Sequence, residues 1–150
     1  LYVANDFGRN SLFLNETSPG GSPRFREAAA ELGLEDMASG MSAAWGDHNR
    51  DGRMDLYVGN MFSAAGNRIT FQRRFTGARP DTAVQLQRMA RGNTLFQGEQ
   101  EGSFRDVSET AGVTMGRWAW SSLFADLNND GWQDLLVSNG YLTNKLPEDL

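Results

Sequence analysis

A nine-residue motif, D-x-N-x-D-G-x-x-D, occurs twice in this chain, at residues 47–55 and 126–134. Each copy runs directly into an apolar segment of strand-like composition, residues 56–60 and 135–139. Oxygen-bearing side chains at alternate positions, with glycine at the sixth, let a chain wrap around a hard cation such as Ca²⁺. Two copies in register within a longer repeat predict calcium-binding loops and a fold built from repeated units.

The predicted ligands occupy positions 1, 3, 5, 7 and 9 of each loop. Side-chain oxygens supply four of them, and position 7 supplies its backbone carbonyl. Glycine at position 6, such as Gly52, permits the positive φ of a sharp turn. The predicted metal-site residues are Asp47, Asn49, Asp51, Arg53 and Asp55 in the first loop and Asp126, Asn128, Asp130, Trp132 and Asp134 in the second.

Two alternatives to these calcium loops deserve comparison. An EF-hand loop ends in a bidentate Glu at position 12, where this chain has Val58 and Val137. The flanking segments are short and rich in aromatic or β-branched residues, which predicts a strand on each side rather than a helix. A hairpin that holds no ion is disfavoured because three crowded carboxylates repel one another. We expect the ion to staple the hairpin rather than take part in catalysis.

The loops belong to a longer repeat. Residues 25–27 align with residues 104–106 at the same spacing as the loops, and residues 10–13 align with residues 93–96 at a slightly longer spacing. Residues 1–5 repeat the strand that follows each loop, so we expect a further loop before Leu1. Four short strands per unit, in tandem, predict β-propeller blades.

The expected fold class is therefore all-β, with propeller blades and a short helix in an insertion. Residues 1–39 are predicted to end one blade, residues 40–113 to form a complete blade, and residues 114–150 to begin the next. A closed propeller needs four to eight blades. We therefore expect the chain to be a fragment of a larger protein that supplies the rest of the propeller.

A basic insertion at residues 61–92 lengthens the turn between the second and third strands of the complete blade. It carries six arginines against one aspartate, a local balance of +5. Residues 81–91 combine an N-capping Asp81 with good helix formers, and Gly92 provides a stop, which predicts a short helix. Either the arginines meet an anionic ligand, or the insertion is a solvated excursion packed against the acidic blades, which we favour. The arginines are Arg68, Arg73, Arg74, Arg79, Arg88 and Arg91.

Composition excludes several classes of function. A hydrophobic content of 39% predicts a packed core, and a net charge of −5 argues against general nucleic-acid binding. No apolar run approaches the ~20 residues of a membrane span. No signal peptide is visible, but its absence says little, because residues 1–5 already look like the middle of a strand. The sequence has no cysteine, which excludes a disulfide scaffold, a thiolate zinc site and a cysteine nucleophile.

No catalytic residue is predicted, and we expect the protein not to be an enzyme. Its single histidine, His48, stands at position 2 of the first loop, where the side chain is expected to point away from the ion. A Ser-His-Asp triad would have to use that histidine. The tryptophans offer a sugar-stacking platform as an alternative, but we expect them to pack between blades. They are Trp45, Trp118, Trp120 and Trp132.

Residues 42–58 resemble an FG-GAP/VCBS-type repeat, and residues 104–113 are similar to the segment that links such repeats. Together with residues 119–126 they resemble the propeller part of proteins that carry an ASPIC/UnbV domain, including cartilage acidic protein-like chains. The resemblance implies a seven-bladed, integrin-α-like propeller with Ca²⁺ in the blade loops, at the positions already named. It also implies an extracellular, cell-surface or periplasmic setting.

The expected function is a calcium-stabilised binding or adhesion module with a protein or glycan ligand, without nucleic-acid binding or membrane insertion. Calcium sites in extracellular modules bind at about 10⁻⁴–10⁻³ M, which also favours a place outside the cytoplasm. Two alternatives stay open. The propeller belongs to a secreted polysaccharide-degrading enzyme, or it is a scaffold that supports another domain.

Overall fold

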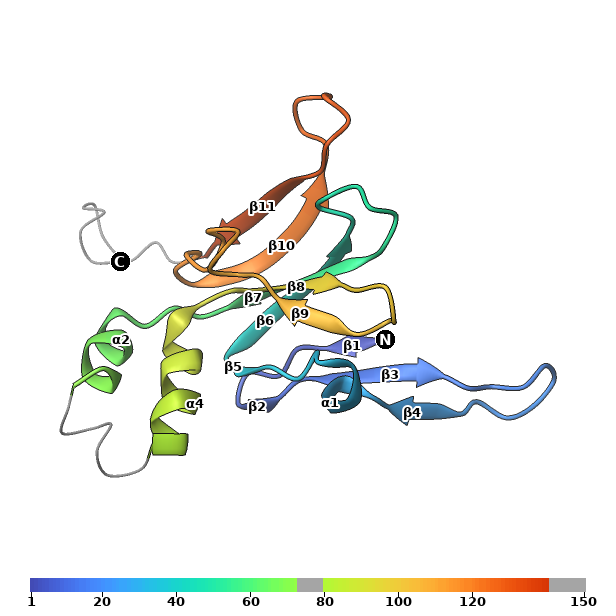
Figure 1. Ribbon diagram of the computed structural model, residues 1–150, viewed down its shortest axis with the longest axis horizontal. Helices are drawn as coiled ribbons and strands as arrows, with labels where there is room; N and C mark the ends of the chain where they lie inside the picture. Colours follow the sequence, from blue (N-terminus) through green and yellow to red (C-terminus); the bar gives the residue numbers. More distant parts are fainter. Residues whose placement is uncertain (73–79, 141–150) are drawn as a thin grey trace.

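The structure is a computed structural model that describes residues 1–72 and 80–140. Short antiparallel sheets dominate it, which confirms the predicted all-β class (Figure 1). The first sheet has the order β1-β3-β4, from β1 (Tyr2–Val3), β3 (Ser11–Asn15) and β4 (Phe25–Glu27). A small ladder pairs β2 (Gly8–Arg9) with β5 (Met37–Ala38).

The second sheet is a four-stranded meander in which each strand pairs with the next along the chain. Its strands are β6 (Gly40–Gly46), β7 (Asp55–Asn60), β8 (Thr94–Gly98) and β9 (Phe104–Asp106). A hairpin of β10 (Ala119–Ala125) and β11 (Asp134–Asn139) follows. The aligned sequence segments thus form equivalent strands: β4 and β9 are last in their sheets, and β3 and β8 precede them. These sheets are propeller-type blades, whereas the exact boundaries between blades stay a prediction.

Strand β7 lies at the centre of the core because both of its faces are covered. Leu56 and Val58 pack with Phe96 against the first sheet, in a cluster that includes Leu34. Tyr57 points to the opposite face and packs with Leu95 against the β10–β11 hairpin. Successive side chains of a strand face opposite sides, so an apolar run such as Leu56–Val58 suits a strand buried between neighbouring sheets.

A four-residue helix, α1 (Ala29–Leu32), was not predicted and connects β4 to Leu34. It ends at Gly33, whose φ of 76° lies in the left-handed region. A Cβ at Gly33 would lie 2.6 Å from the carbonyl oxygen of Phe104, so only glycine lets α1 approach β9 this closely. This contact holds the first sheet against the four-stranded sheet.

The variant Gly33→Ala is expected to lose about 3 kcal/mol of unfolding free energy, because it adds left-handed strain and a backbone clash. Gly20→Ala is the matched control: Gly20 has the same φ of 76° but open space around its Cβ position. That control is expected to cost about 1 kcal/mol. Urea denaturation of both variants measures the difference. Equal losses would show that the approach to Phe104 carries no strain.

The basic insertion contains two helices in its described part, α2 (Ala64–Thr70) and α4 (Pro80–Arg91). The expected helix is confirmed as α4, but Asp81 is not its N-cap, because the helix already begins at Pro80 and Asp81 lies in its first turn. Helix α2 was not predicted; the hydroxyl of Ser63 caps it by accepting from the Gly66 N–H at 3.0 Å. Arg73, Arg74 and Arg79 lie outside the described residues.

Two arginines of α4 pack against acidic residues of the sheets. Arg88 donates from Nε to Asp36 Oδ1 at 2.8 Å and from Nη1 to Asp106 Oδ2 at 3.0 Å. Arg91 donates to the same Asp106 oxygen at 2.8 Å. Asp36 is fully buried just before β5, and Asp106 ends β9. Helix α4 therefore packs against the segment before β5 and against the end of β9 at the same time. This agrees with the expectation that the insertion packs on acidic blades.

The charges of this cluster stabilise one another. Burial lowers the pKa of the Arg88 guanidinium, but the neighbouring Asp36 and Asp106 outweigh it and raise the pKa above its usual value. Burial raises the pKa of Asp106, yet hydrogen bonds from Ser108 and Arg91 hold it below its usual range. Each partner thus favours the charged form of the other.

No helix in the described part of the chain is long and apolar enough to cross a membrane.

Candidate metal loops

The two D-x-N-x-D-G-x-x-D segments connect β6 to β7 (loop 1, residues 47–54) and β10 to β11 (loop 2, residues 126–133), with the last aspartate starting the second strand. The strand–loop–strand setting is confirmed. Both loops have the same backbone turn: position 4 has φ of 58° at Arg50 and 60° at Asn129. Position 6 has φ of 81° at Gly52 and 83° at Gly131. The left-handed conformation at position 4 was not predicted. In loop 2 this position is Asn129, and asparagine tolerates a positive φ better than most residues.

The aspartate at position 1 organises each turn. Asp47 accepts hydrogen bonds from the N–H groups of Asp51 at 3.0 Å and Gly52 at 2.9 Å. Asp126 accepts from Asp130 at 3.0 Å and Gly131 at 2.8 Å. The same residue types therefore make the same bonds in both copies, and the oxygens hold the loop backbone in a tight arc.

Positions 3 and 5 form a second matched pair. The amide of Asn49 donates to the Asp51 carboxylate at 2.8 Å, and Asn128 donates to Asp130 at 2.8 Å. In each loop the position 5 carboxylate also accepts the N–H of position 7. Hydrogen bonds from Trp132 and Asn128, with the nearby charge of Arg50, hold the pKa of Asp130 below its usual range. Loss of solvent raises the pKa of Asp51, but bonds from Arg53 and Asn49 outweigh it and lower the pKa overall.

Position 9 differs between the loops. Asp55 is fully buried: its Oδ1 accepts from Gly98 N at 2.9 Å, and its Oδ2 accepts from His48 N at 2.9 Å. The same Oδ2 lies 2.5 Å from His48 Nδ1. Asp134 is only partly buried and accepts from Leu127 N at 3.0 Å. The contact between the His48 ring and Asp55 was not predicted; that the ring points away from a bound ion stays a prediction.

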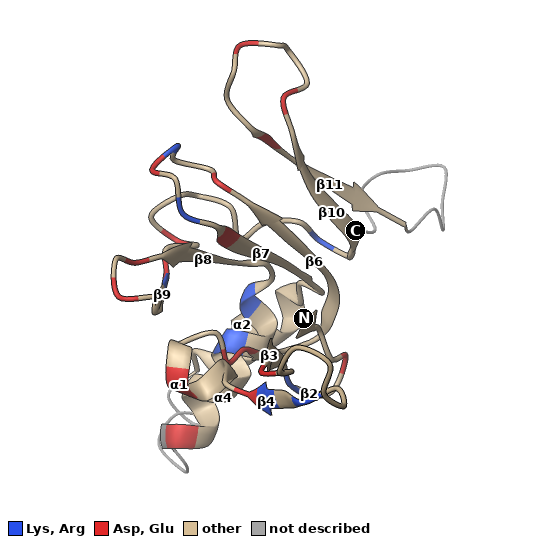
Figure 2. Ribbon diagram, turned by 90° about the vertical axis from the view of Figure 1, so that its right-hand side faces the viewer, with Lys and Arg blue, Asp and Glu red and all other residues tan. Residues whose placement is uncertain are grey.

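Position 7 also differs. The Arg53 guanidinium pairs with Asp51 Oδ2, and its Nε donates to the carbonyl of Gly98 at 3.0 Å. Trp132 takes this position in loop 2, and its side chain is about half exposed. Figure 2 shows acidic residues along the loop between β10 and β11, and both basic and acidic residues along the loop between β6 and β7.

The oxygen donors suit Ca²⁺ in kind: each loop offers three carboxylates, one amide oxygen and a backbone carbonyl. In the described residues, however, no three His, Cys, Asp or Glu side chains converge closely enough to enclose a metal ion. The carboxylates accept hydrogen bonds instead, from backbone and side-chain donors of their own loops and, at Asp55 Oδ1, from Gly98 N on β8. Asp51 Oδ2 and Asp55 Oδ2 already have two polar partners each. Within the described residues, each carboxylate oxygen of loop 2 has at most one, so loop 2 keeps more lone pairs for a cation. The ligand assignments stay a prediction, with loop 2 the better fit.

The loops touch each other across the two blades. The guanidinium of Arg50 stacks over the Trp132 ring at 5.0 Å from its centroid. Gln133 Oε1 accepts the N–H of Asp47 at 2.9 Å. The first contact joins position 4 of loop 1 to position 7 of loop 2, and the second joins position 1 of loop 1 to position 8 of loop 2. Sequence spacing alone does not reveal either contact.

The four tryptophans have separate surroundings. Trp45 packs edge-on against Tyr2 and Phe104, between the first and second sheets, as expected for packing between blades. Trp132 lies beneath Arg50, and Trp118 lines a pocket. Trp120 lies against Gly140. This arrangement does not form the single stacking platform that was the alternative.

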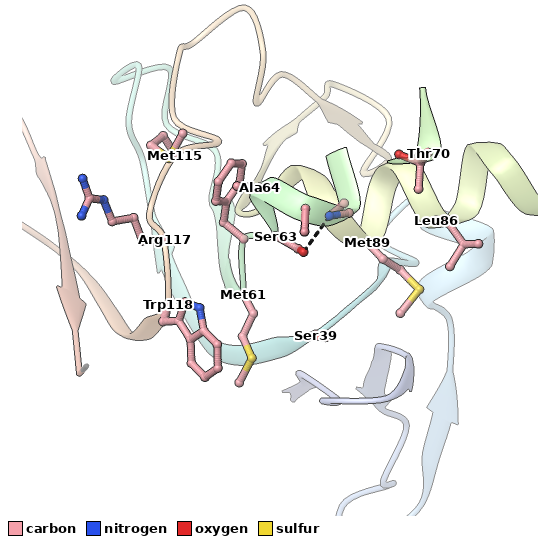
Figure 3. Close-up of a pocket in the computed structure, with 14 residues that line it drawn as sticks. Ser39, Met61, Ser63, Ala64, Thr70, Leu86, Met89, Met115, Arg117 and Trp118 are labelled. Atoms are coloured by element: carbon pink, nitrogen blue, oxygen red, sulfur yellow. Dashed lines mark hydrogen bonds between the residues drawn. The ribbon is translucent and has the colours of Figure 1, made fainter. Parts of the chain in front are cut away.

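The pocket that contains Trp118 lies between the insertion helices and the chain leading into β10 (Figure 3). Its volume is about 790 Å³. The lining is mainly apolar, with Met61, Met89 and Met115 around it and Arg117 as the charged side chain among the described lining residues. Arg117 points away from α4 in Figure 3, and the pocket brings no acid–base pair together.

A model of the FG-GAP-like repeat matches residues 1–58 and 79–137. Both loops and all the strands that flank them fall within these segments, apart from the last residues of β7 and β11. No curated protein and no solved structure matches the chain. The match covers well over half of the sequence and agrees with the repeated four-strand pattern, so the chain belongs to the FG-GAP-like repeat family.

Proposed function

We propose that this chain is a calcium-binding part of an FG-GAP-like propeller that acts in binding or adhesion and is not an enzyme. The observation that carries the proposal is the matched pair of loops, which repeat the same oxygen donors, left-handed residues and side-chain-to-backbone hydrogen bonds. One such turn occurs by chance more easily than two in equivalent hairpins. Family membership supports the propeller-type binding module.

In this proposal Ca²⁺ staples each hairpin. Side-chain oxygens at positions 1, 3, 5 and 9 and the carbonyl at position 7 hold the ion, which supplies the positive charge that crowded carboxylates need. Asp47 and Asp126 shape the loops through their backbone bonds, so little chain ordering remains for the ion to induce. The ion then holds β6 to β7 and β10 to β11 at one end of the blades.

The setting and partner follow from the same proposal. Loops with weak calcium affinity stay filled where environmental Ca²⁺ is abundant, which favours an extracellular, cell-surface or periplasmic protein. A protein or glycan would bind on the surfaces that the stapled blades hold in place. We also propose that the complete protein forms a seven-bladed propeller like that of ASPIC/UnbV proteins. The alternatives are a secreted polysaccharide-degrading enzyme and a supporting scaffold.

Calcium at 100 times its dissociation constant is expected to stabilise the protein by about 2.7 kcal/mol for each occupied loop. The double variant Asp51→Ala with Asp130→Ala is expected to lose this gain, because each loop loses its central carboxylate. Calorimetric titration of Ca²⁺ measures binding, and thermal melting with and without Ca²⁺ measures stabilisation.

A charge-matched control for this titration is Asp6→Ala with Glu109→Ala, since both carboxylates are exposed and lie outside the loops. It is expected to bind calcium like the unaltered protein. Binding that survives the double variant would place the ion elsewhere. No saturable binding in the unaltered protein would refute the calcium function.

A further inference from the structure

The two loops share a backbone but differ in charge. Loop 1 with its final aspartate, residues 47–55, has three aspartates and two arginines, a formal charge of −1 apart from His48. Loop 2 with its final aspartate, residues 126–134, has three aspartates and no basic residue, a formal charge of −3. The number of unneutralised carboxylates is one of the main determinants of calcium affinity in loops of this kind.

Arg53 is placed to neutralise loop 1 from inside. Its guanidinium pairs with Asp51 Oδ2, which belongs to the central carboxylate of the loop. Its Nε donates to Gly98 O on β8 at 3.0 Å, so the neighbouring strand fixes the side chain in this position. Arg53 and Asp51 are both partly buried, which limits screening of their attraction by solvent. A planar guanidinium also holds a carboxylate by directed hydrogen bonds.

His48 occupies a second carboxylate of loop 1, that of Asp55. Its ring nitrogen and its N–H both contact Asp55 Oδ2, while Gly98 N occupies Oδ1. Loop 2 has Leu127 and Trp132 at the corresponding positions 2 and 7, and neither side chain can pair with a carboxylate in this way. The differences at positions 2 and 7 therefore act in the same direction.

We propose that Arg53 is a built-in counter-cation of loop 1, which Ca²⁺ must displace, and that loop 2 is consequently the stronger calcium site. This inference rests on the proposed calcium function. It gives the two loops different calcium affinities: in loop 1 the ion has to displace the arginine, whereas loop 2 fills at a lower calcium concentration. Position 7 contributes most to the difference, because its guanidinium directly contacts a predicted ligand, although its side chain is not itself a ligand.

Arg50 does not remove this asymmetry. Its guanidinium reaches loop 2, but it stacks on Trp132 and, within the described residues, donates no hydrogen bond to a carboxylate of that loop. The charge of Arg50 weakens calcium binding at loop 2 only through space. The Arg53 guanidinium, in contrast, directly contacts a predicted ligand.

Calorimetric Ca²⁺ titration of two single variants separates the loops. Asp51→Ala leaves loop 2 intact and is expected to keep the tighter site with a dissociation constant within about twofold of the unaltered protein. Asp130→Ala leaves only loop 1 intact and is expected to bind Ca²⁺ at least about tenfold more weakly than Asp51→Ala, because the Arg53 guanidinium lies next to the ion site and repels the cation. Equal affinities in the two variants, or tighter binding by loop 1, would overturn the inference and leave the calcium function standing.

The second test adds Arg53→Gln to Asp130→Ala. Removing the guanidinium is expected to strengthen calcium binding at loop 1 about tenfold, because Asp51 regains its uncompensated charge. Arg24→Gln in the same background is the control, since it removes one exposed positive charge far along the sequence from both loops. Affinity that is unchanged by Arg53→Gln, or raised equally by Arg24→Gln, would refute the role of Arg53. Absence of binding in both single variants and the unaltered protein would instead refute the proposed function, and this inference with it.

Discussion

Replacing Arg88 with alanine is expected to lower the free energy of unfolding by about 3–5 kcal/mol, because it leaves a buried carboxylate without its counter-charge. Asp36 is fully buried, and Arg88 is its ion-pair partner among the described residues. Asn60 also donates to Asp36, at 3.1 Å, but an amide carries no charge. The lost guanidinium further removes a bond to Asp106 and the stacking of Arg88 over Phe96.

Urea denaturation measures this loss, with Arg68→Ala as the matched control. Arg68 lies on α2 in the same insertion, is exposed, and forms no ion pair within the described residues, so its variant is expected to stay within about 0.5 kcal/mol. Adding Asp36→Asn to Arg88→Ala removes the stranded charge and is expected to recover part of the stability. A loss below about 1 kcal/mol for Arg88→Ala would show that the ion pairs of α4 with Asp36 and Asp106 do not stabilise the fold.

The elements that sequence analysis located correctly are those with a local physical signal. The loops were recognisable because oxygen side chains and glycine must stand at fixed spacings to form the turn. Strands β7 and β11 were recognisable as apolar runs directly after the loops. Residues such as Tyr57 alternate with Leu56 and Val58, and their burial on both faces follows from blades that pack on either side.

The features that were missed depend on residues distant in sequence. Helix α1 ends where Gly33 meets Phe104, and nothing near residue 33 reveals that neighbour. The pairing of Arg88 with Asp36 joins the insertion to an earlier blade. The position of Arg53 was predicted only as a source of a carbonyl, since its side-chain anchor, Gly98, lies on another strand. The contact of His48 with Asp55 was not predicted, because the burial of Asp55 depends on β8.

Asp55→Ala is expected to destabilise the protein by about 3–4 kcal/mol even when a chelator removes all Ca²⁺. The carboxylate is fully buried and accepts hydrogen bonds from Gly98 N and His48 N. Its loss leaves the buried Gly98 N–H and the partly buried His48 N–H without this partner, at about 1–3 kcal/mol each. The ring of His48 loses its contact as well. Asp55 therefore stabilises the metal-free blade, whatever it contributes to an ion.

Asp134→Ala is the matched comparison, because Asp134 holds the same position in loop 2 but is only partly buried and accepts a single backbone bond, from Leu127 N. In chelator it is expected to cost about 1 kcal/mol or less. With Ca²⁺ at a concentration that fills loop 2 but not the weaker loop 1, its cost should grow, whereas that of Asp55→Ala should change little. Chemical denaturation of both variants, with chelator and with calcium, gives four free energies. Equal costs in chelator would show that the bonds to Gly98 and His48 contribute no net stability, and that position 9 has the same role in both loops.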